Sequence, residues 1–410
     1  MESEPIFLIG ASKLIADLLG LKASELNIIY EYRNSYSTKK IAKRNGKLRT
    51  INEPHAVLKM FQSRFLKRWL YRIYFRGFLD GHIYSFLPER SAIKNVRAHT
   101  KGNARYIIKL DLKDAFPSIT SSLLSSALIW AVNRELKFLR NDLPELRKWY
   151  GRGHERKCAY PRNPLFPYKR VAWFRKLIKN EKAKERVDDI ISQFVFRLVP
   201  LLTYEGSLPQ GAPTSPFLLN LVISYLALNN RIKHYLKSQG YSSLVTVYCD
   251  DFTISTSRLP NYELIAGLEA EIERTGLKIN RAKTKVFDRR QIAPLIMGLR
   301  LTKTTLSGDE IKPLFTKLPV TRGARKRYNK GGKWQLNEVA VPKKYLRQTR
   351  AMMHNLARQP QDDKLIATVK GRLSYIISVY GRRNLPNQLK APYLEITQAG
   401  IPMFKYNIFS

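Results

Sequence analysis

Three aspartates stand out in this strongly basic chain because each one borders an apolar run. Asp111 ends the run at 105–112, and Asp250 and Asp251 lie between two apolar runs within 244–256. Such runs predict strands, so carboxylates at their ends are expected at one edge of a sheet. Carboxylates gathered there could hold two Mg²⁺ ions about 4 Å apart, which clamp both oxygens of a phosphoryl transfer. Adjacent aspartates at a hairpin tip are also ordinary turn formers, so that alternative stays open for the pair taken alone.

The elements that must position these carboxylates are both helices and strands. Apolar spacing predicts helices over 11–30, 56–74, 216–238 and 261–275, the last closed by Gly276. The predicted strands are 105–112 and a pair within 244–256 that meet at a tight turn. Strands and helices in this mixed order predict the α+β class.

The charge of the chain points to a polyanionic partner. Lys and Arg total 73 against 32 Asp and Glu, a formal net charge of +41, while 44% of the residues are hydrophobic. That hydrophobic content excludes wholesale disorder, and the positive field favours nucleic acid.

The sequence has no apolar run of about 18 residues, and its acidic first residues do not resemble a secretory signal. With only Cys158 and Cys249 there is no disulfide framework or zinc cluster, so we expect a cytoplasmic protein without membrane contact.

Two segments combine positive charge with features suited to nucleic acid. Residues 146–176 hold ten Lys or Arg and one acidic residue, interleaved with seven Trp, Tyr and Phe. Residues 322–333 hold six Lys or Arg, no acidic residue and two adjacent glycines. Aromatic rings can stack on bases while cations pair with phosphates, which predicts RNA contacts. A solvated charged face is the alternative for either segment alone.

Four motifs resemble those of reverse transcriptases and occur in that family's order. They are Asp-Leu-Lys-Asp-Ala-Phe at 111–116, Leu-Pro-Gln-Gly-Ala-Pro-Thr-Ser-Pro at 208–216, Tyr-Cys-Asp-Asp at 248–251 and Gly-Leu-Lys-Ile-Asn-Arg-Ala-Lys-Thr at 276–284. Upstream, 47–54 and 81–91 resemble bacterial fingers motifs, and downstream 371–376 resembles a thumb segment of retron and group II intron enzymes. The resemblance covers most of the chain.

This resemblance implies a right-hand polymerase with fingers, a palm of antiparallel sheet and helices, and a helical thumb. We expect residues 1–104 to form the N-terminal region and fingers and residues 105–300 the palm. A basic and aromatic insertion is expected at about 135–200, and residues 301–410 should hold the basic loop, the thumb and a C-terminal tail.

The resemblance also implies roles for individual residues. Asp111, Asp250 and Asp251 would be catalytic and would hold the metals together with the carbonyl of Leu112. The nucleotide would contact Lys47, Arg49, Phe116, Gln210, Gly211 and Lys283. Phe116 would lie beneath the sugar and exclude a 2′-hydroxyl, although it could instead be an ordinary core residue. Gln210-Gly211 could be only a turn, and Lys283 could be only a solvated side chain. Nucleic acid would contact Arg90, Trp149, Tyr150, Arg152, Arg156, Tyr160, Arg170, Arg325, Lys326 and Arg327.

Two departures from retron patterns bear on the class of reverse transcriptase that this chain resembles. The retron pattern Asn-Ala-x-x-His reads Asn-Val-Arg-Ala-His at 95–99, and the retron Val-Thr-Gly reads Ile-Met-Gly at 296–298. A compact chain with Tyr-Cys-Asp-Asp more closely resembles a defence-associated bacterial reverse transcriptase of the type 2 class. That class implies Mg²⁺ (two ions, or Mn²⁺), dNTPs and phage defence in the bacterial cytoplasm. It also implies a structured non-coding RNA, which acts as template and cofactor, and a cDNA product.

Three alternatives remain beside this interpretation. A retron enzyme would make RNA-linked DNA, and a relative of abortive-infection enzymes would polymerise DNA without a template. From outside the enzymes, an RNA-binding scaffold could have kept the polymerase fold without its activity. The presence of all three aspartates disfavours the scaffold, because an inactive descendant would be expected to lose metal-binding carboxylates first.

Overall fold

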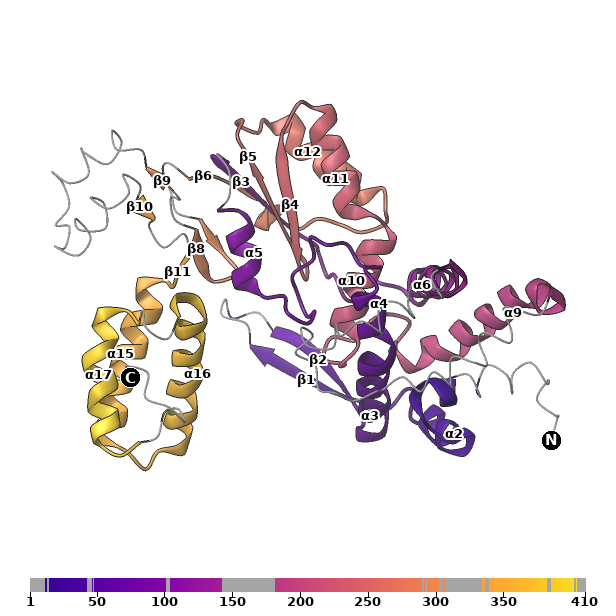
Figure 1. The fold of residues 1–410 in the computed structure, drawn as a ribbon, viewed down its shortest axis with the longest axis horizontal. Helices are drawn as coiled ribbons and strands as arrows, with labels where there is room; N and C mark the ends of the chain where they lie inside the picture. Colours follow the sequence, from indigo (N-terminus) through magenta and orange to yellow (C-terminus); the bar gives the residue numbers. More distant parts are fainter. Residues whose placement is uncertain are drawn as a thin grey trace.

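The computed structural model describes residues 12, 15–42, 46, 48–100, 104–141, 181–289, 291, 294–301, 305–306, 334–335, 339–381, 385–401 and 403. The basic segments 146–176 and 322–333 lie outside these residues, as does Lys47. Within them the molecule has a central antiparallel sheet, helices packed on it, a separate β-hairpin and a C-terminal bundle of helices (Figure 1).

The central sheet has four strands in the order β4-β5-β3-β6, and all neighbours are antiparallel. These strands are β3 (Tyr106–Asp111), β4 (Ser243–Tyr248), β5 (Asp251–Thr256) and β6 (Lys285–Asp288). The predicted strand at 105–112 and the predicted strand pair within 244–256 are therefore confirmed. The tight turn between β4 and β5 holds only Cys249 and Asp250.

The two faces of this sheet differ sharply because side chains alternate along a strand. One face is apolar and buried; it carries Ile108, Leu110, Val245, Val247, Phe252 and Ile254. The opposite face follows the other register positions and is polar near the β4–β5 turn, where Asp111, Lys109, Asp251 and Thr253 lie. The alternation of side chains along the strands thus places the core on one face of the sheet and the candidate site on the other.

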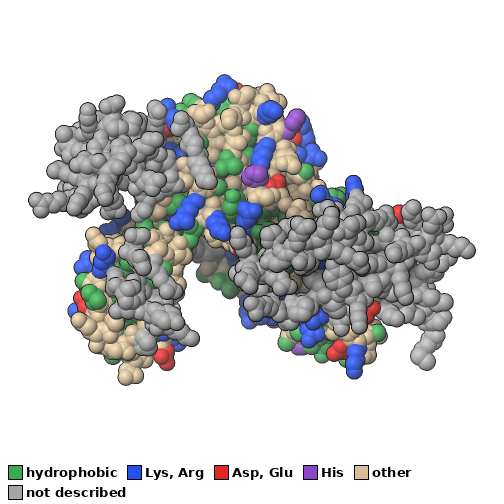
Figure 2. Space-filling model, in the orientation of Figure 1, with side chains coloured by type: hydrophobic (Ala, Val, Ile, Leu, Met, Phe, Trp, Pro, Cys, Tyr) green, Lys and Arg blue, Asp and Glu red, His purple; other side chains and the backbone are tan. Residues whose placement is uncertain are grey.

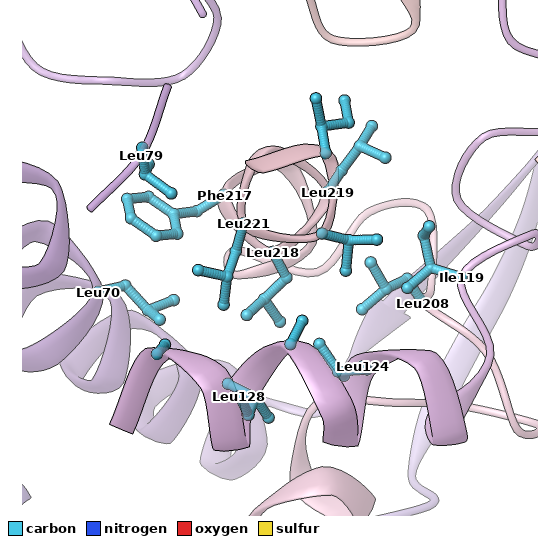
Figure 3. Close-up of a cluster of buried hydrophobic side chains, with 14 of the residues drawn as sticks. Leu70, Leu79, Ile119, Leu124, Leu128, Leu208, Phe217, Leu218, Leu219 and Leu221 are labelled. Carbon is cyan, nitrogen blue, oxygen red and sulfur yellow. The ribbon is translucent and has the colours of Figure 1, made fainter. Parts of the chain in front are cut away.

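Helices from three parts of the chain pack around the apolar face (Figure 1). They are α6 (Ser121–Asn141), α10 (Ser215–Tyr225), α11 (Leu228–Ser238) and α12 (Tyr262–Glu273). Figure 3 shows α10 surrounded by apolar side chains, with Leu124 and Leu128 of α6 on one side and Leu79 on another. Helix α11 fits closely against α12, since a Cβ on Gly267 would lie 1.8 Å from the Tyr235 hydroxyl oxygen.

Two helices expected as single units are interrupted in the structure. The expected helix over 216–238 is α10 followed by α11, broken at Ala227, which has a left-handed φ of 51°. The expected helix over 11–30 is broken after residues 15–19, where Gly20 has a φ of 63°, and resumes as α2 (Ala23–Glu31). Both predictions of a continuous helix were wrong because apolar spacing continues across residues whose left-handed φ ends the helix.

The segment before the sheet forms a helix and a hairpin. The expected helix over 56–74 is confirmed as α3 (Ala56–Phe65), a π-helical turn (Leu66–Leu70) and α4 (Tyr71–Phe75) in direct succession. Strands β1 (Tyr36–Ala42) and β2 (Leu48–Pro54) form an antiparallel hairpin. Helix α9 (Glu181–Leu198) and a 3₁₀ turn (Val199–Leu201) lead toward α10, and α12 ends before Gly276 as expected.

A second hydrophobic core joins the C-terminal helices to the sheet. The bundle consists of α15 (Lys343–Arg358), α16 (Asp363–Tyr380) and α17 (Asn387–Gln398). Its core includes residues of a small sheet of β7 (Leu295–Ile296), β8 (Leu299–Leu301) and β11 (Val339–Ala340). Val96 of α5 (Ala92–Ala98) and Ile107 of β3 belong to the same core. Two further short strands, β9 (Thr305–Leu306) and β10 (Trp334–Gln335), pair with each other.

Buried polar groups form contacts between elements that are distant in the sequence. Glu135 of α6 pairs with both Arg72 and Arg76. His99, which follows α5, contacts the hydroxyls of Thr246 at 2.7 Å and Ser255 at 3.0 Å, and burial lowers the pKa of this histidine to about 3.

The expected α+β class is confirmed by the mixture of helices with antiparallel sheets. Figure 2 shows a hollow between the C-terminal bundle and the hairpin side of the molecule, with Lys and Arg side chains above it. Across the described ranges, no helix combines the length and apolarity that a bilayer span requires.

Candidate active site

The three aspartates come together at one end of the central sheet. Asp111, the last residue of β3, stands directly opposite Asp251, the first residue of β5. The amide of Leu112 donates a 2.9 Å hydrogen bond to the carbonyl oxygen of Asp250. Because Asp111 and Asp251 occupy the same register, their side chains leave the sheet on the same face. Asp111 is 7% exposed, and Asp250 and Asp251 are half-buried.

A third segment, which follows α12, runs along the other side of Asp111. The amide of Asn280 donates to the carbonyl of Asp111 at 2.7 Å, and the amide of Lys113 donates to the carbonyl of Lys278 at 2.8 Å. The chain then makes a 3₁₀ turn (Arg281–Lys283) before β6. This turn brings the Lys283 ammonium to 2.9 Å from each carboxylate oxygen of Asp111. The motif at 276–284 is therefore placed against the first aspartate by backbone pairing.

The site concentrates negative charge in a partly dry environment. Burial raises the pKa of Asp111, while Lys283 opposes the rise and Asp250 adds to it. Burial also raises the pKa of Asp251 to about 6; Lys109 opposes this rise, and Asp250 and Asp111 add to it. Like charges this close disfavour simultaneous ionisation. The cluster therefore favours the binding of a proton or of a cation.

The resemblance to reverse transcriptases implies divalent metal ions, and the donors here fit such ions in part. No group of three or more His, Cys, Asp and Glu side chains converges into a closed metal cage within the part of the chain that the structure describes. An open site is what Mg²⁺ chemistry needs, because this ion keeps several waters and takes one or two carboxylates plus substrate phosphates. Asp111 and Asp251 supply hard oxygen donors from neighbouring strands at one end of the sheet.

The loop that holds Gln210 and Gly211 packs against the β1–β2 hairpin. The amide of Asn52 donates to the carbonyl of Gln210 at 2.8 Å. Gly211 has a φ of +130°, and a Cβ there would lie 2.8 Å from Ile51 Cγ2 and 2.9 Å from the Asn52 carbonyl oxygen. Glycine is thus required where this loop meets β2, a close approach to backbone that the motif alone did not reveal.

Other residues expected to bind nucleotide or nucleic acid have these places in the structure. Phe116 is half-buried and packs on the edge of the main core. Arg49 is exposed on β2. The Arg90 guanidinium lies over the ring of Tyr84, 4.9 Å from its centroid, and its Nε lies 3.4 Å from the Tyr74 hydroxyl.

The remaining expected residues lie outside the described residues. They are Lys47, Trp149, Tyr150, Arg152, Arg156, Tyr160, Arg170, Arg325, Lys326 and Arg327.

Sequence reasoning missed three residues that lie close to the aspartates. Lys109 shares the face of Asp111 on β3, two positions earlier, and strand periodicity could have found it. Ser85 and Asn220 are fully buried and bond to each other, and the Ser85 hydroxyl accepts from the Cys249 amide of the β4–β5 turn. The sequence pattern around them hardly indicated a role, since Ser85 lies in a loop and Asn220 in a mostly apolar helix.

Comparison with known proteins relates the chain to reverse transcriptases. Residues 170–301 match the family described as reverse transcriptase (RNA-dependent DNA polymerase). The chain is 26% identical to the retron Mx162 reverse transcriptase of Myxococcus xanthus, covering 90% of this chain and 64% of that protein. It is 28% identical to the retron Mx65 enzyme of the same organism, covering 68% of this chain and 54% of that protein. With the Ec86 enzyme of Escherichia coli the identity is 23%, covering 81% and 72%.

These matches confirm the expected kinship with bacterial reverse transcriptases, and they fall on the retron side of the superfamily. The chain spans less than two thirds of the length of the two Myxococcus relatives.

Among solved structures, the matches include telomerases at low similarity. A truncated apo telomerase from Candida tropicalis is 15% identical with a TM-score of 0.35, covering 66% of this chain and 54% of that chain. Telomerase from Candida albicans with a telomeric RNA fragment is 13% identical with a TM-score of 0.37, covering 91% and 58%. These scores are too low to support an argument about function.

Proposed function

We propose, from its kinship with bacterial retron-type reverse transcriptases, that this chain is an RNA-directed DNA polymerase. It would extend a primer with dNTPs along an RNA template. The observation that carries the proposal is the pairing of Asp111 with Asp251 across β3 and β5, with Asp250 bonded through its carbonyl to Leu112. Carboxylates at one open sheet end suit phosphoryl transfer.

In this proposal Asp111, Asp250 and the carbonyl of Leu112 hold two Mg²⁺ ions, and Asp251 supports them. When bound, the ions would lower the pKa of the primer hydroxyl and offset charge on the leaving pyrophosphate. Lys283 is close enough to Asp111 to supply positive charge beside an incoming triphosphate. Phe116 would lie beneath the sugar, and Arg49 with Gln210 and Gly211 would border the nucleotide.

The regional assignment follows the same proposal. Residues 1–104 would form the fingers, 105–300 the palm with a basic and aromatic insertion at about 135–200, and 301–410 the thumb region. The protein would act in the bacterial cytoplasm with a structured non-coding RNA as template and cofactor. The surplus of positive charge supports an RNA that also contacts the outside of the protein.

Two biological settings share this chemistry. A defence-associated enzyme would release cDNA copied from its RNA, whereas a retron enzyme would leave DNA joined to RNA. The names of the relatives support the retron setting, whereas the departures from the retron patterns at 95–99 and 296–298 count against it and favour the defence setting. The two differ in whether the product stays attached to RNA.

One experiment distinguishes the defence-associated enzyme from the retron enzyme, and both from an untemplated polymerase and from an RNA-binding scaffold. The protein is purified with its nucleic acid, supplied with Mg²⁺ and dNTPs, and the products and the retained RNA are sequenced. DNA complementary to a retained RNA supports the proposal, and DNA without any complement indicates untemplated synthesis. If no DNA forms with either Mg²⁺ or Mn²⁺, the RNA-binding scaffold is the better account. A shift in product mobility after ribonuclease treatment identifies RNA-linked DNA.

A further inference from the structure

The turn that carries Asp250 and Asp251 has an unfavourable backbone. Cys249, its first residue, has a φ of 60°, while Asp250 has no positive φ. A two-residue hairpin loop with a positive φ only at its first position follows the type II′ pattern, which favours glycine there. A residue other than glycine in this conformation costs free energy and persists only when its surroundings fix it. Some other group must therefore stabilise the turn.

That group is the hydroxyl of Ser85. The backbone amide of Cys249 donates a hydrogen bond to Ser85 Oγ at 2.7 Å. Ser85 Oγ in turn donates to Oδ1 of Asn220 at 3.1 Å, and Nδ2 of Asn220 donates to the Ser85 carbonyl at 2.8 Å. Ser85 and Asn220 are both 0% exposed. The Ser85 hydroxyl thus uses its donor and one acceptor site at once, which alanine cannot do.

The segment around Ser85 is itself held to β4 by backbone bonds. The amide of Val247 donates to the His82 carbonyl at 3.0 Å, and the amide of Tyr84 donates to the Val247 carbonyl at 2.9 Å. Ile83 and Val247 form a parallel bridge. The position of Ser85 beside the turn is therefore fixed by backbone bonds to β4. Asn220 belongs to α10, the helix that follows the Gln210-Gly211 loop.

We propose that Ser85 and Asn220 are positioning residues that hold the Cys249-Asp250 turn in its strained conformation and so set the carboxylates of Asp250 and Asp251. Neither residue touches the reacting groups. Ser85 acts through the amide of Cys249 and Asn220 acts through Ser85, and this inference rests on the proposed polymerase function. Because small displacements of catalytic groups can cost about a hundredfold in rate, a loosened turn should lower kcat more than substrate affinity.

The test compares Ser85→Ala with a matched control, Ser224→Ala. Ser224 lies one turn further along α10, and its hydroxyl also bridges two groups: it donates to the Asn220 carbonyl at 2.9 Å and accepts from the amide of Asp80 at 3.1 Å. DNA synthesis is measured on poly(rA)·oligo(dT) with dTTP and Mg²⁺. We expect Ser85→Ala to lower kcat by about tenfold or more with KM for dTTP changed less than about threefold, and Ser224→Ala to keep kcat near wild type.

Two further measurements exclude a general loss of structure. In a Ser85→Ala background, Cys249→Gly should recover at least about threefold of the lost kcat, because glycine tolerates the positive φ without help. Amide hydrogen exchange of peptides covering 248–252 should accelerate in Ser85→Ala and stay unchanged in Ser224→Ala.

Wild-type kcat with unchanged exchange in Ser85→Ala, or equal losses in both serine variants, would overturn the inference. If the wild-type protein itself makes no DNA, the proposed function fails, and the exchange comparison still decides whether Ser85 holds the turn.

Discussion

The ammonium nitrogen of Lys283 lies 2.9 Å from both carboxylate oxygens of Asp111. The two residues belong to segments 172 positions apart, which backbone pairing of Asp111 with Asn280 brings side by side. The contact partly neutralises the charge of Asp111.

Replacement of both Asp250 and Asp251 by Ala should abolish DNA synthesis and leave RNA binding within about threefold of wild type. The chemistry depends on a few carboxylates, whereas binding depends on many Lys and Arg contacts. Primer extension and filter binding measure the two properties. The chain offers a matched control in the exposed pair Asp188-Asp189 on α9, whose double alanine variant should keep synthesis. Polymerisation near the wild-type rate in the Asp250/Asp251 variant would contradict the assignment.

Asp251 should make the metal-free protein more stable as the pH falls. Its pKa is raised from 3.8 to about 6 in the folded protein, so the folded state binds a proton more tightly than the unfolded state. The resulting stabilisation is complete below about pH 4 and is lost as the pH rises through about 6. Melting temperatures in EDTA at pH 7 and pH 5 measure it, each relative to Asp251→Asn. A wild-type gain no larger than that of Asp251→Asn would show that Asp251 titrates normally.

Phe116→Ala should increase the incorporation of ribonucleotides relative to deoxyribonucleotides by about tenfold, with some loss of overall efficiency. The motive is the position of Phe116 five residues after Asp111 and its half-buried place at the edge of the core. Competition between rNTPs and dNTPs on one template measures the change. A folded variant with unchanged selectivity would return Phe116 to ordinary core packing.

Gly211→Ala should lower kcat/KM for dNTPs by about tenfold or more, because its Cβ would collide with Ile51 and with the Asn52 carbonyl of β2. Gly206→Ala is the matched control: its φ is +75°, and a Cβ there meets nothing within 4 Å. Both variants carry backbone strain from a positive φ, and only Gly211→Ala adds the collision with the hairpin. Equal kinetics in the two variants would mean that the contact with β2 does not matter for synthesis.

The purified protein should retain one enriched, folded RNA after a high-salt wash. Contacts to phosphates weaken steeply with salt, whereas shape recognition and base stacking are less screened. The retained RNA is sequenced after washes at low and high ionic strength. Broad recovery of cellular RNA without an enriched species would remove the dedicated RNA and leave a general basic polymerase.

Much of the central sheet was predictable from the sequence because its signals are local. The apolar runs that end at Asp111 and flank Asp250 predicted strands β3, β4 and β5, and the structure has them at nearly those bounds. Helix breaks were less predictable. Ala227 interrupts the apolar pattern of 216–238 with a left-handed φ, and no residue type at that position announces it. Packing of α10 and α11 against different partners decides such a break.

The sequence by itself determined which residues could do chemistry here: three aspartates at strand ends, in the order of reverse transcriptase motifs, within a chain of net charge +41. Only the tertiary structure decided how those residues meet. The pairing of Asp111 with Asp251, the Lys283 contact, and the Ser85–Asn220 support of the Cys249 turn each join segments more than 130 positions apart. Residue type and strand period are encoded locally, whereas register between distant segments is chosen by the packing of the whole chain.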